Sequence, residues 1–400
     1  MRSTQEAVLA EMRRWGYRYV VTPTLESLDV LALGLESDQR RRLFKLTDAD
    51  GSLLALVGER TVPVARLAAG KLQAAPLPLR LCYAGAVLTN DPDRFTGRRE
   101  AYQVGAELLG ASGTVADAEV IAMAARCLDA AGLRDYQVDV GHAGFFQGLM
   151  DGMELSADIK SSIKAVLSRR DFVGLEALLE QTPLKSAEHE LLLRFPALRG
   201  QTDILEAAGK LVRNRRSEQA LEELSRVHAL LGAYGLGGSV NLDLGAIRDF
   251  DYYTGVIFEG YGQDLGSPLA QGGRYDRLLQ RFGRPAPATG FMIHLDLLGQ
   301  GLRRSGRGPE LTRLDTAVAW SAAGLPAALR LGASLRLFGM RTVVDTQARG
   351  LAGARDWAET LGAHNLVHVD GRGLVGWVPT GGRLRRLSAE QVVARLAGSS

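Results

Sequence analysis

Residues 245–261 read Gly-Ala-Ile-Arg-Asp-Phe-Asp-Tyr-Tyr-Thr-Gly-Val-Ile-Phe-Glu-Gly-Tyr, and a second stretch, Gly-Gly-Arg-Tyr-Asp, follows at 272–276. Arg248, Tyr252 and Tyr253 stand close together, with no hydrophobic alternation around them. An arginine, two tyrosines and a glycine-rich strand turn suit a pocket for a small zwitterion with a planar side chain. The alternative is a polar hairpin whose tyrosines are structural, because a short motif by itself is only a hypothesis.

These two stretches resemble the histidine-recognition motifs of class II histidyl-tRNA synthetases. The first motif, Arg-x-x-Asp-Tyr-Tyr-Thr, matches Arg248 to Thr254, and the second is Gly-Gly-Arg-Tyr-Asp. Their order and spacing agree with that family, and the likeness extends through roughly residues 5–300. The resemblance implies an α+β fold. It would contain a class II aminoacyl-tRNA synthetase-like antiparallel sheet flanked by helices, an all-α insertion and a small C-terminal α/β domain.

The composition sets limits on the class of protein. A chain of 400 residues suggests two or three domains, and 46% hydrophobic residues is typical of a soluble globular protein. The net charge of only +3 argues against a dominant nucleic-acid-binding surface. We find no run of 18 apolar residues and no signal-peptide core, so we expect a cytoplasmic protein without a membrane segment.

The chemistry of the cysteines and histidines points the same way. Cys82 and Cys127 lie in apolar surroundings without metal-ligand spacing, so they read as buried thiols in a reducing compartment. The six histidines form no metal motif. We therefore expect neither a metal site nor a cofactor.

The pattern along the chain predicts two domains, residues 1–304 and residues 310–400, joined by a glycine-rich linker. Helical periodicity from about 143 to 235 predicts the all-α insertion within the first domain. Strand and helix signals alternate through the second domain, which predicts a small α/β unit. Residues 17–26 read as a strand, and with Pro23 and Glu26 this strand resembles motif 1 of class II synthetases, which builds their dimer interface.

The resemblance implies a set of histidine-binding residues. The loop residues would hold the α-amino group through charge-assisted hydrogen bonds. A carboxylate and an amide four residues apart on one strand would face the same side and satisfy both ring nitrogens. The tyrosines would line the ring, and the arginine would lie beside the ligand carboxylate. In chain order the set is Glu59, Thr61, Gln103, Glu107, Arg248, Tyr252, Tyr253 and Tyr275.

Each of these residues also has a structural interpretation. Glu59 could be an acid at a helix start, Glu107 could pair with a surface arginine, and the tyrosines could be core residues. We favour a pocket because so many residues match at the expected places together.

The ATP-binding positions of the family depart from its pattern. Aligned without gaps from Tyr83, the motif 2 arginine position is occupied by Thr89, and the motif 3 arginine position is occupied by Leu297. Neither side chain replaces a planar, always-charged guanidinium. Two lost charge-assisted contacts would cost about 3–6 kcal/mol, or on the order of 10²–10⁴-fold in rate. We therefore expect no catalysis by this chain.

A synthetase fold with its amino-acid pocket and without its ATP arginines resembles the regulatory subunits of ATP phosphoribosyltransferase. That family implies a non-catalytic subunit, needed for activity and feedback inhibition of the first step of histidine biosynthesis. It also implies L-histidine as ligand, a short-form catalytic subunit as partner, and a homodimer within a hetero-oligomer. A divergent histidyl-tRNA synthetase and a stand-alone synthetase-like RNA-binding paralogue remain the alternatives. A nucleic-acid partner is not expected.

Overall fold

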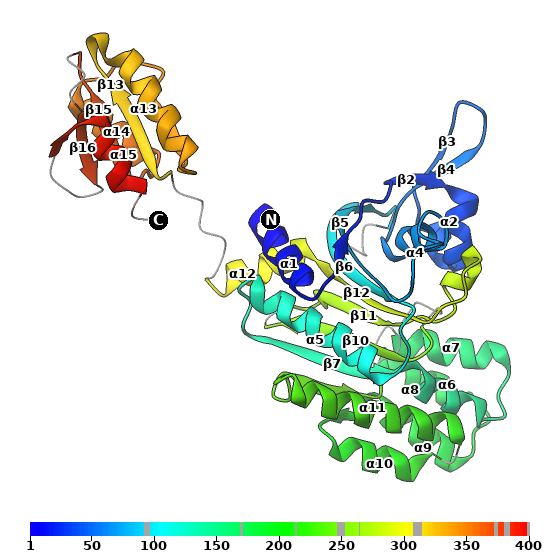
Figure 1. Cartoon of the computed structure of the whole chain (residues 1–400). Helices are drawn as coiled ribbons and strands as arrows, with labels where there is room; N and C mark the ends of the chain where they lie inside the picture. The colour runs from blue at the N-terminus through cyan, green and yellow to red at the C-terminus, as the bar shows by residue number, and fades with distance from the viewer. Residues whose placement is uncertain are drawn as a thin grey trace. The chain divides into compact units, whose positions relative to one another are not determined.

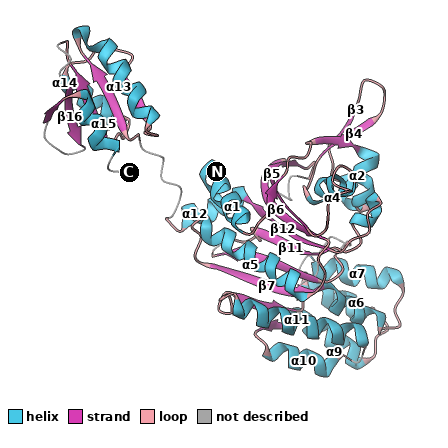
Figure 2. Cartoon of the chain, in the orientation of Figure 1, coloured by secondary structure: helices cyan, strands magenta, loops and turns pink. Residues whose placement is uncertain are grey.

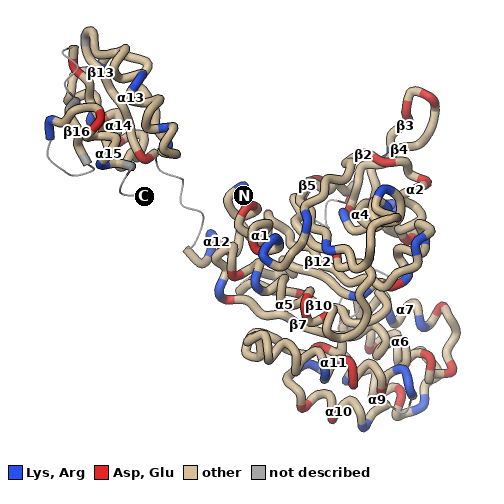
Figure 3. Tube along the Cα trace, in the orientation of Figure 1, with Lys and Arg blue, Asp and Glu red and all other residues tan. Residues whose placement is uncertain are grey.

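The computed structural model divides the chain into two compact units, Met1–Gly308 and Pro309–Ser400, which we describe separately (Figure 1). The described residues are 1–91, 97–168, 171–212, 214–245, 253–263, 265–306, 314–371, 375–379 and 385–397. Arg248 and Tyr252 lie outside them. Acidic and basic residues are interspersed along both units, in keeping with the small net charge (Figure 3). Within the described part, every helix is too short or too polar to cross a bilayer.

A nine-stranded sheet forms the centre of the first unit, in the order β1-β5-β6-β12-β11-β10-β7-β9-β8. The pairings are antiparallel except for β1 with β5 and β7 with β9. From edge to edge the strands are β1 (Arg18–Tyr19), β5 (Leu79–Leu88), β6 (Glu100–Leu109), β12 (Ala288–His294), β11 (Ala270–Arg274), β10 (Val256–Gly262), β7 (Tyr136–His142), β9 (Val240–Asp243) and β8 (Arg199–Gly200).

One face of this sheet is covered by α1 (Arg2–Arg14) and α5 (Thr114–Ala130) (Figure 1). α5 is rich in alanine, the best helix former, and contains neither proline nor glycine. It ends before Gly132, whose φ of 94° is the left-handed conformation that commonly closes a helix. Small side chains let α5 approach the strands closely, and most of its residues are buried.

The opposite face carries a second apolar cluster around α4 (Thr61–Ala69). The cluster includes Leu81 and Tyr83 of β5, with Tyr275 just after β11. Beside it lie α2 (Leu28–Gly34), α3 (Ser37–Arg41) and a three-stranded sheet of β2 (Leu25–Ser27), β4 (Leu53–Leu56) and β3 (Lys45–Thr47). α12 (Leu295–Arg304) follows β12 directly.

Helices fill most of the stretch between β7 and β9 (Figure 2). They are α6 (Ala143–Asp151), α7 (Ala157–Ser168), α8 (Phe172–Glu180), α9 (Ser186–Arg194), α10 (Asp203–Leu211) and α11 (Arg215–Ala233). The two-residue strand β8 interrupts them and pairs with β9 at the sheet edge. A strand this short shows no alternation, so the sequence pattern could not reveal it.

The segment predicted as one strand over residues 17–26 is instead two short strands, β1 and β2, with Pro23 between them. Proline has no amide hydrogen for a ladder. In addition, the carbonyls of Thr22 and Pro23 accept hydrogen bonds from the Arg60 guanidinium. A distant side chain thus occupies backbone groups that a strand would have used.

The second unit is a five-stranded mixed sheet in the order β14-β13-β15-β16-β17. The strands are β13 (Thr316–Trp320), β14 (Thr342–Val344), β15 (Asn365–Val369), β16 (Val375–Pro379) and β17 (Arg385–Leu387). The helices are α13 (Leu325–Leu337), α14 (Leu351–Thr360) and α15 (Ala389–Ala397). One apolar cluster packs α13 and α15 against the sheet, and a second packs α14.

Candidate ligand-binding site

Glu107 lies toward the C-terminal end of β6 and is only 1% exposed. The Tyr275 hydroxyl donates a hydrogen bond to Glu107 Oε2. Burial raises the pKa of Glu107 to about 8, although the nearby hydroxyls of Tyr275 and Thr61 oppose the rise. The charge of Glu59 raises it further. The site therefore brings two carboxyl groups together in a water-poor setting, where a cationic ligand group would be favoured.

Three polar side chains on this sheet face are each paired in register with a glycine. Glu107 faces Gly290 of β12, Tyr83 of β5 faces Gly105 of β6, and Gln103 of β6 faces Gly85 of β5. A Cβ at Gly290 would overlap the Glu107 carboxylate, and a Cβ at Gly105 would overlap the Tyr83 ring. The glycines supply the space that lets polar groups lie flat on the sheet.

Four buried polar atoms at this site have no hydrogen-bond partner among the described residues. They are Arg60 Nε, Tyr83 Oη, Gln103 Oε1 and Glu107 Oε1. Most buried polar atoms in proteins are paired, so a group of exceptions on neighbouring residues requires an explanation. Unused hydrogen-bonding capacity on one sheet face is the property expected of a pocket for a polar ligand.

Glu59 and Thr61 enter the site from the start of α4. The Glu59 carboxylate accepts hydrogen bonds from the amides of Thr61 at 3.0 Å and Val62 at 2.9 Å. Glu59 therefore does act as an acid at the start of a helix, as its structural interpretation predicts. The same bonds fix the Glu59 carboxylate beside the pocket, since an acid at a helix N-terminus is held by the exposed amides and the helix dipole.

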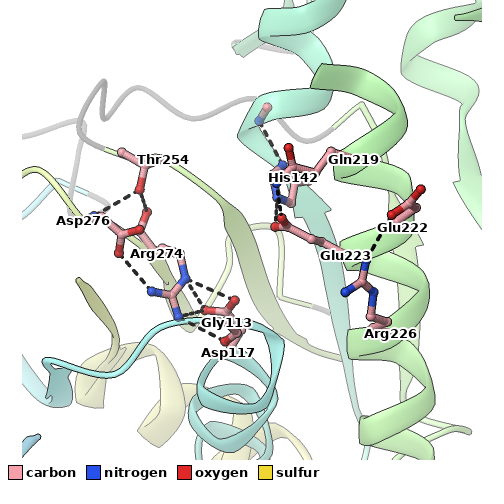
Figure 4. A network of polar contacts seen from close by, with 11 residues as sticks. Gly113, Asp117, His142, Gln219, Glu222, Glu223, Arg226, Thr254, Arg274 and Asp276 are labelled. Atoms are coloured by element: carbon pink, nitrogen blue, oxygen red, sulfur yellow. Dashed lines mark hydrogen bonds and ion pairs between the residues drawn. The ribbon is translucent and has the colours of Figure 1, made fainter. Parts of the chain in front are cut away.

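The Gly-Gly-Arg-Tyr-Asp stretch has two separate roles (Figure 4). Arg274 is almost fully buried and pairs with Asp117 of α5 at 2.8 Å and with Asp276 at 2.9 Å. Asp276 also accepts from the amide of Ala288 at 2.9 Å, and its own amide donates to Thr254 Oγ1 at 3.0 Å. Because neighbouring side chains of an extended chain point to opposite faces, Tyr275 is directed to the sheet face that carries Glu107. Arg274 and Asp276 therefore hold Tyr275 in place from the other side.

Tyr253 is half-buried and packs against the α4 cluster, with its ring over the Cα of Gly273. The structure thus brings Glu59, Thr61, Gln103, Glu107 and Tyr275 to one sheet face and places Tyr253 at the edge of the same cluster. Sequence reasoning did not select Tyr83 or Arg60. The glycines at 85, 105 and 290, each opposite a polar residue, are the signal that could have identified Tyr83.

The two positions expected to have lost ATP arginines are both occupied by uncharged side chains with other contacts. Thr89 is buried, accepts from the amide of Asp91 at 3.1 Å and donates to the carbonyl of Arg42 at 3.4 Å. Leu297 on α12 packs against the main apolar cluster. The nearby arginines are engaged elsewhere: Arg98 pairs with Asp296 at 3.3 Å, and Arg99 donates to Asn90 at 3.0 Å. In the described ranges no three His, Cys, Asp or Glu side chains gather as a metal site would require.

Comparisons with known proteins place these observations in a family. Residues 1–298 match the family model described as histidyl-tRNA synthetase. The chain is similar to the ATP phosphoribosyltransferase regulatory subunit of Desulforamulus reducens, at 37% identity over 373 residues, which cover 93% of this chain and 92% of that protein.

Two solved structures share the fold. A Bacillus halodurans protein described as an ATP phosphoribosyltransferase regulatory subunit/histidyl-tRNA synthetase has a TM-score of 0.82 and 32% identity, over 92% of this chain and 94% of its own. The histidyl-tRNA synthetase of Nostoc has a TM-score of 0.84 at 19% identity, over 99% and 95% of the two chains. The second likeness shows the fold alone. The expected α+β, class II synthetase-like fold is confirmed, with a large sheet that is mixed rather than wholly antiparallel.

The raised pKa of Glu107 predicts a pH dependence of stability. Between its ordinary value of 4.5 and about 8, the folded chain holds a proton that the unfolded chain releases. The stabilisation linked to this proton is complete below about pH 4.5 and is lost as the pH rises through about 8. Relative to Glu107→Gln, the wild-type free energy of unfolding should fall by up to about 1.4 kcal/mol per pH unit across this window. Urea denaturation of both proteins at several pH values measures this difference. If the free energies of unfolding of the two proteins change with pH in parallel, the pKa of Glu107 is not raised.

The buried Arg274–Asp117 pair predicts a large cost when Asp117 is neutralised. Asp117→Asn leaves a buried guanidinium with one carboxylate fewer, which should destabilise the protein by about 3–5 kcal/mol. Asp129→Asn on the same helix is the matched control, because its partners Arg126 and Arg134 are exposed and such pairs contribute at most about 1 kcal/mol. Thermal or urea unfolding distinguishes the two variants. If the two substitutions lower the free energy of unfolding by the same amount, the burial of the Arg274–Asp117 pair adds nothing to its contribution.

Proposed function

The chain belongs to the ATP phosphoribosyltransferase regulatory subunits, a family of histidine biosynthesis, and from this membership we propose that it senses free L-histidine at the pocket around Glu107. The observation that supports this most is the pair of unused acceptors, Gln103 Oε1 and Glu107 Oε1, on one sheet face. Two acceptors match the two N–H donors of an imidazolium ring, and a protonated Glu107 can instead donate to the bare nitrogen of a neutral ring. The residues 1–304 would form the histidine-binding domain, and residues 310–400 a separate C-terminal domain.

The ligand would use the charges that the site already holds. Its ammonium group would bind between Glu59 and Thr61, where a charge-assisted bond to the carboxylate is available. Its ring would lie against β6, between Gln103 and Glu107, with the Tyr275 hydroxyl beside the carboxylate. Arg248, Tyr252 and Tyr253 complete the proposed set, with Arg248 beside the ligand carboxylate.

We assign no reaction to this chain itself. A class II synthetase stabilises the charge that develops on the ATP phosphates with guanidinium groups. Thr89 and Leu297 stand at the positions where the family's arginines would be. The chemistry would instead be carried out by a short-form catalytic subunit, with which this chain would form a hetero-oligomer.

A homodimer within that hetero-oligomer is supported by the edge of the large sheet. β1 is an edge strand, and an edge strand offers unpaired backbone groups to a second chain. Beside it, Tyr19, Val21 and Leu25 are exposed apolar residues, with Val21 77% accessible. This surface, the segment around Pro23 and Glu26, is where two copies would meet.

A histidyl-tRNA synthetase is the second candidate, because the matching family model and the second half of the Bacillus halodurans description carry that name. The two functions differ in amino-acid activation. We expect no histidine-dependent exchange of pyrophosphate into ATP, because the two phosphate-binding guanidinium groups are replaced. The control is an authentic histidyl-tRNA synthetase at the same concentration, and clear exchange by this chain would favour the second candidate.

The proposed sensing role predicts a shift in feedback inhibition. When the chain is mixed with a short-form catalytic subunit, Glu107→Ala should leave assembly and basal activity intact. It should raise the histidine concentration for half-inhibition by about tenfold or more, since a hydrogen bond to a charged group contributes about 1.5–3 kcal/mol. Glu206→Ala is the matched control, because Glu206 lies exposed on α10 and, among the described residues, forms an ion pair with the exposed Lys210. If the Glu107→Ala and wild-type inhibition curves coincide, histidine is sensed elsewhere.

A further inference from the structure

Arg60 is a buried cation whose hydrogen-bond partners among the described residues are all uncharged. In the sequence, Arg60 stands between the two proposed ligand residues Glu59 and Thr61. It is only 4% exposed. Nη1 donates to the carbonyl and the hydroxyl of Thr22, both at 3.1 Å, and to the carbonyl of Pro23 at 3.4 Å. Nη2 donates to Thr24 Oγ1 at 3.1 Å and to the carbonyl of Ala86. Burial lowers the pKa of this guanidinium, and the charge of the adjacent acid Glu59 opposes the fall.

Such a group is costly for the fold. Removing a charge from water without an opposite charge hydrogen-bonded to it carries a desolvation penalty that hydrogen bonds to neutral oxygens repay only in part. An apolar side chain of similar length would fill the same space without that penalty. The retained guanidinium therefore indicates a role in connecting the groups that it touches.

The Arg60 guanidinium contacts two separate parts of the structure, the strand β5 at Gly85 and the segment Thr22–Thr24. On one side the guanidinium lies flat over Gly85, where a Cβ would be 2.7 Å from Cζ, and Gly85 is paired in register with Gln103 of the pocket. On the other side it holds the segment Thr22–Thr24, next to the exposed apolar side chain of Val21. Arg66 of α4 makes a second link close by, to Glu26 of β2, two residues beyond this segment, at 2.6 Å.

We propose that Arg60 is a positioning residue that couples the ligand pocket to the segment Thr22–Thr24 at the sheet edge. Ligand bonds to Glu59 and Thr61 restrain the backbone on both sides of Arg60, and Arg60 transmits that restraint to Thr22 and Thr24. Coupling between two sites is reciprocal, so an ordered segment also strengthens ligand binding. The inference rests on the proposed binding of L-histidine, and it adds the route by which occupancy would reach the edge surface.

The test is a double-mutant cycle between Arg60 and Thr24, with L-histidine affinity measured by calorimetry. Thr24 is exposed, and its hydroxyl contacts Arg60 rather than any proposed ligand residue. Thr24→Val should weaken histidine binding about fivefold in the wild-type background and have no effect in the Arg60→Met background. Thr47→Val on β3 is the matched control, an exposed threonine in the same unit, and should bind as wild type does.

Amide hydrogen exchange provides the readout that a purely structural role would not change. L-histidine should slow exchange over residues 19–25 in the wild type and leave it unchanged in Arg60→Met. If the wild type binds L-histidine while Thr24→Val and Thr47→Val bind equally well and residues 19–25 gain no protection, the coupling is wrong. If the wild type itself does not bind L-histidine, the proposed function is wrong. Should Arg60→Met fail to fold, the two threonine variants and the wild-type exchange still decide the question.

Discussion

A carboxyl group on an interior strand of the large mixed sheet, Glu107 on β6, sets conditions that its neighbours must meet. Paired residues on adjacent strands have Cβ atoms only about 5 Å apart, so a long polar side chain can lie flat only where its partner is small. Gly290 provides that space for Glu107. The Tyr275 hydroxyl supplies one hydrogen bond, and Glu107 Oε1 keeps an acceptor that no described residue uses. A sheet built only for stability would have an aliphatic residue at this position.

The same division between support and binding runs through the residues that surround Glu107. The buried Arg274 forms ion pairs with Asp117 and Asp276 on the side of the sheet that α5 covers. These ion pairs fix the end of β11, from which Tyr275 extends. Glu59 combines both tasks, since its carboxylate holds the start of α4 and also borders the pocket. Buried polar networks are stable only when nearly every member is paired. Among the described residues, several unpaired buried atoms lie together on the sheet face where we propose that a ligand binds.

The large sheet is shared with proteins that perform a different task. The histidyl-tRNA synthetase of Nostoc superposes over almost the whole chain at 19% identity, which shows that the architecture tolerates extensive change. A fold by itself does not determine function. In this chain Thr89 anchors the turn after β5, and Leu297 completes the packing of α12. Both residues contribute to the fold, and we propose that they occupy the positions where an activating enzyme would need charge.

The sequence by itself indicated the α+β architecture through its resemblance to class II histidyl-tRNA synthetases, and periodicity and turn residues, which are local properties, predicted individual helices and strands. Its motifs also singled out Glu59, Thr61, Gln103, Glu107 and Tyr275, and the alternation of a strand predicted that Gln103 and Glu107 face the same side. The tertiary structure alone decided that residues 17–26 are not one strand, that β8 joins the sheet edge, and that Arg60 reaches Thr22. The reason is physical. Arg60 and Thr22 are 38 positions apart, and their contact depends on the packing of α4 against β5 rather than on any pattern near either residue.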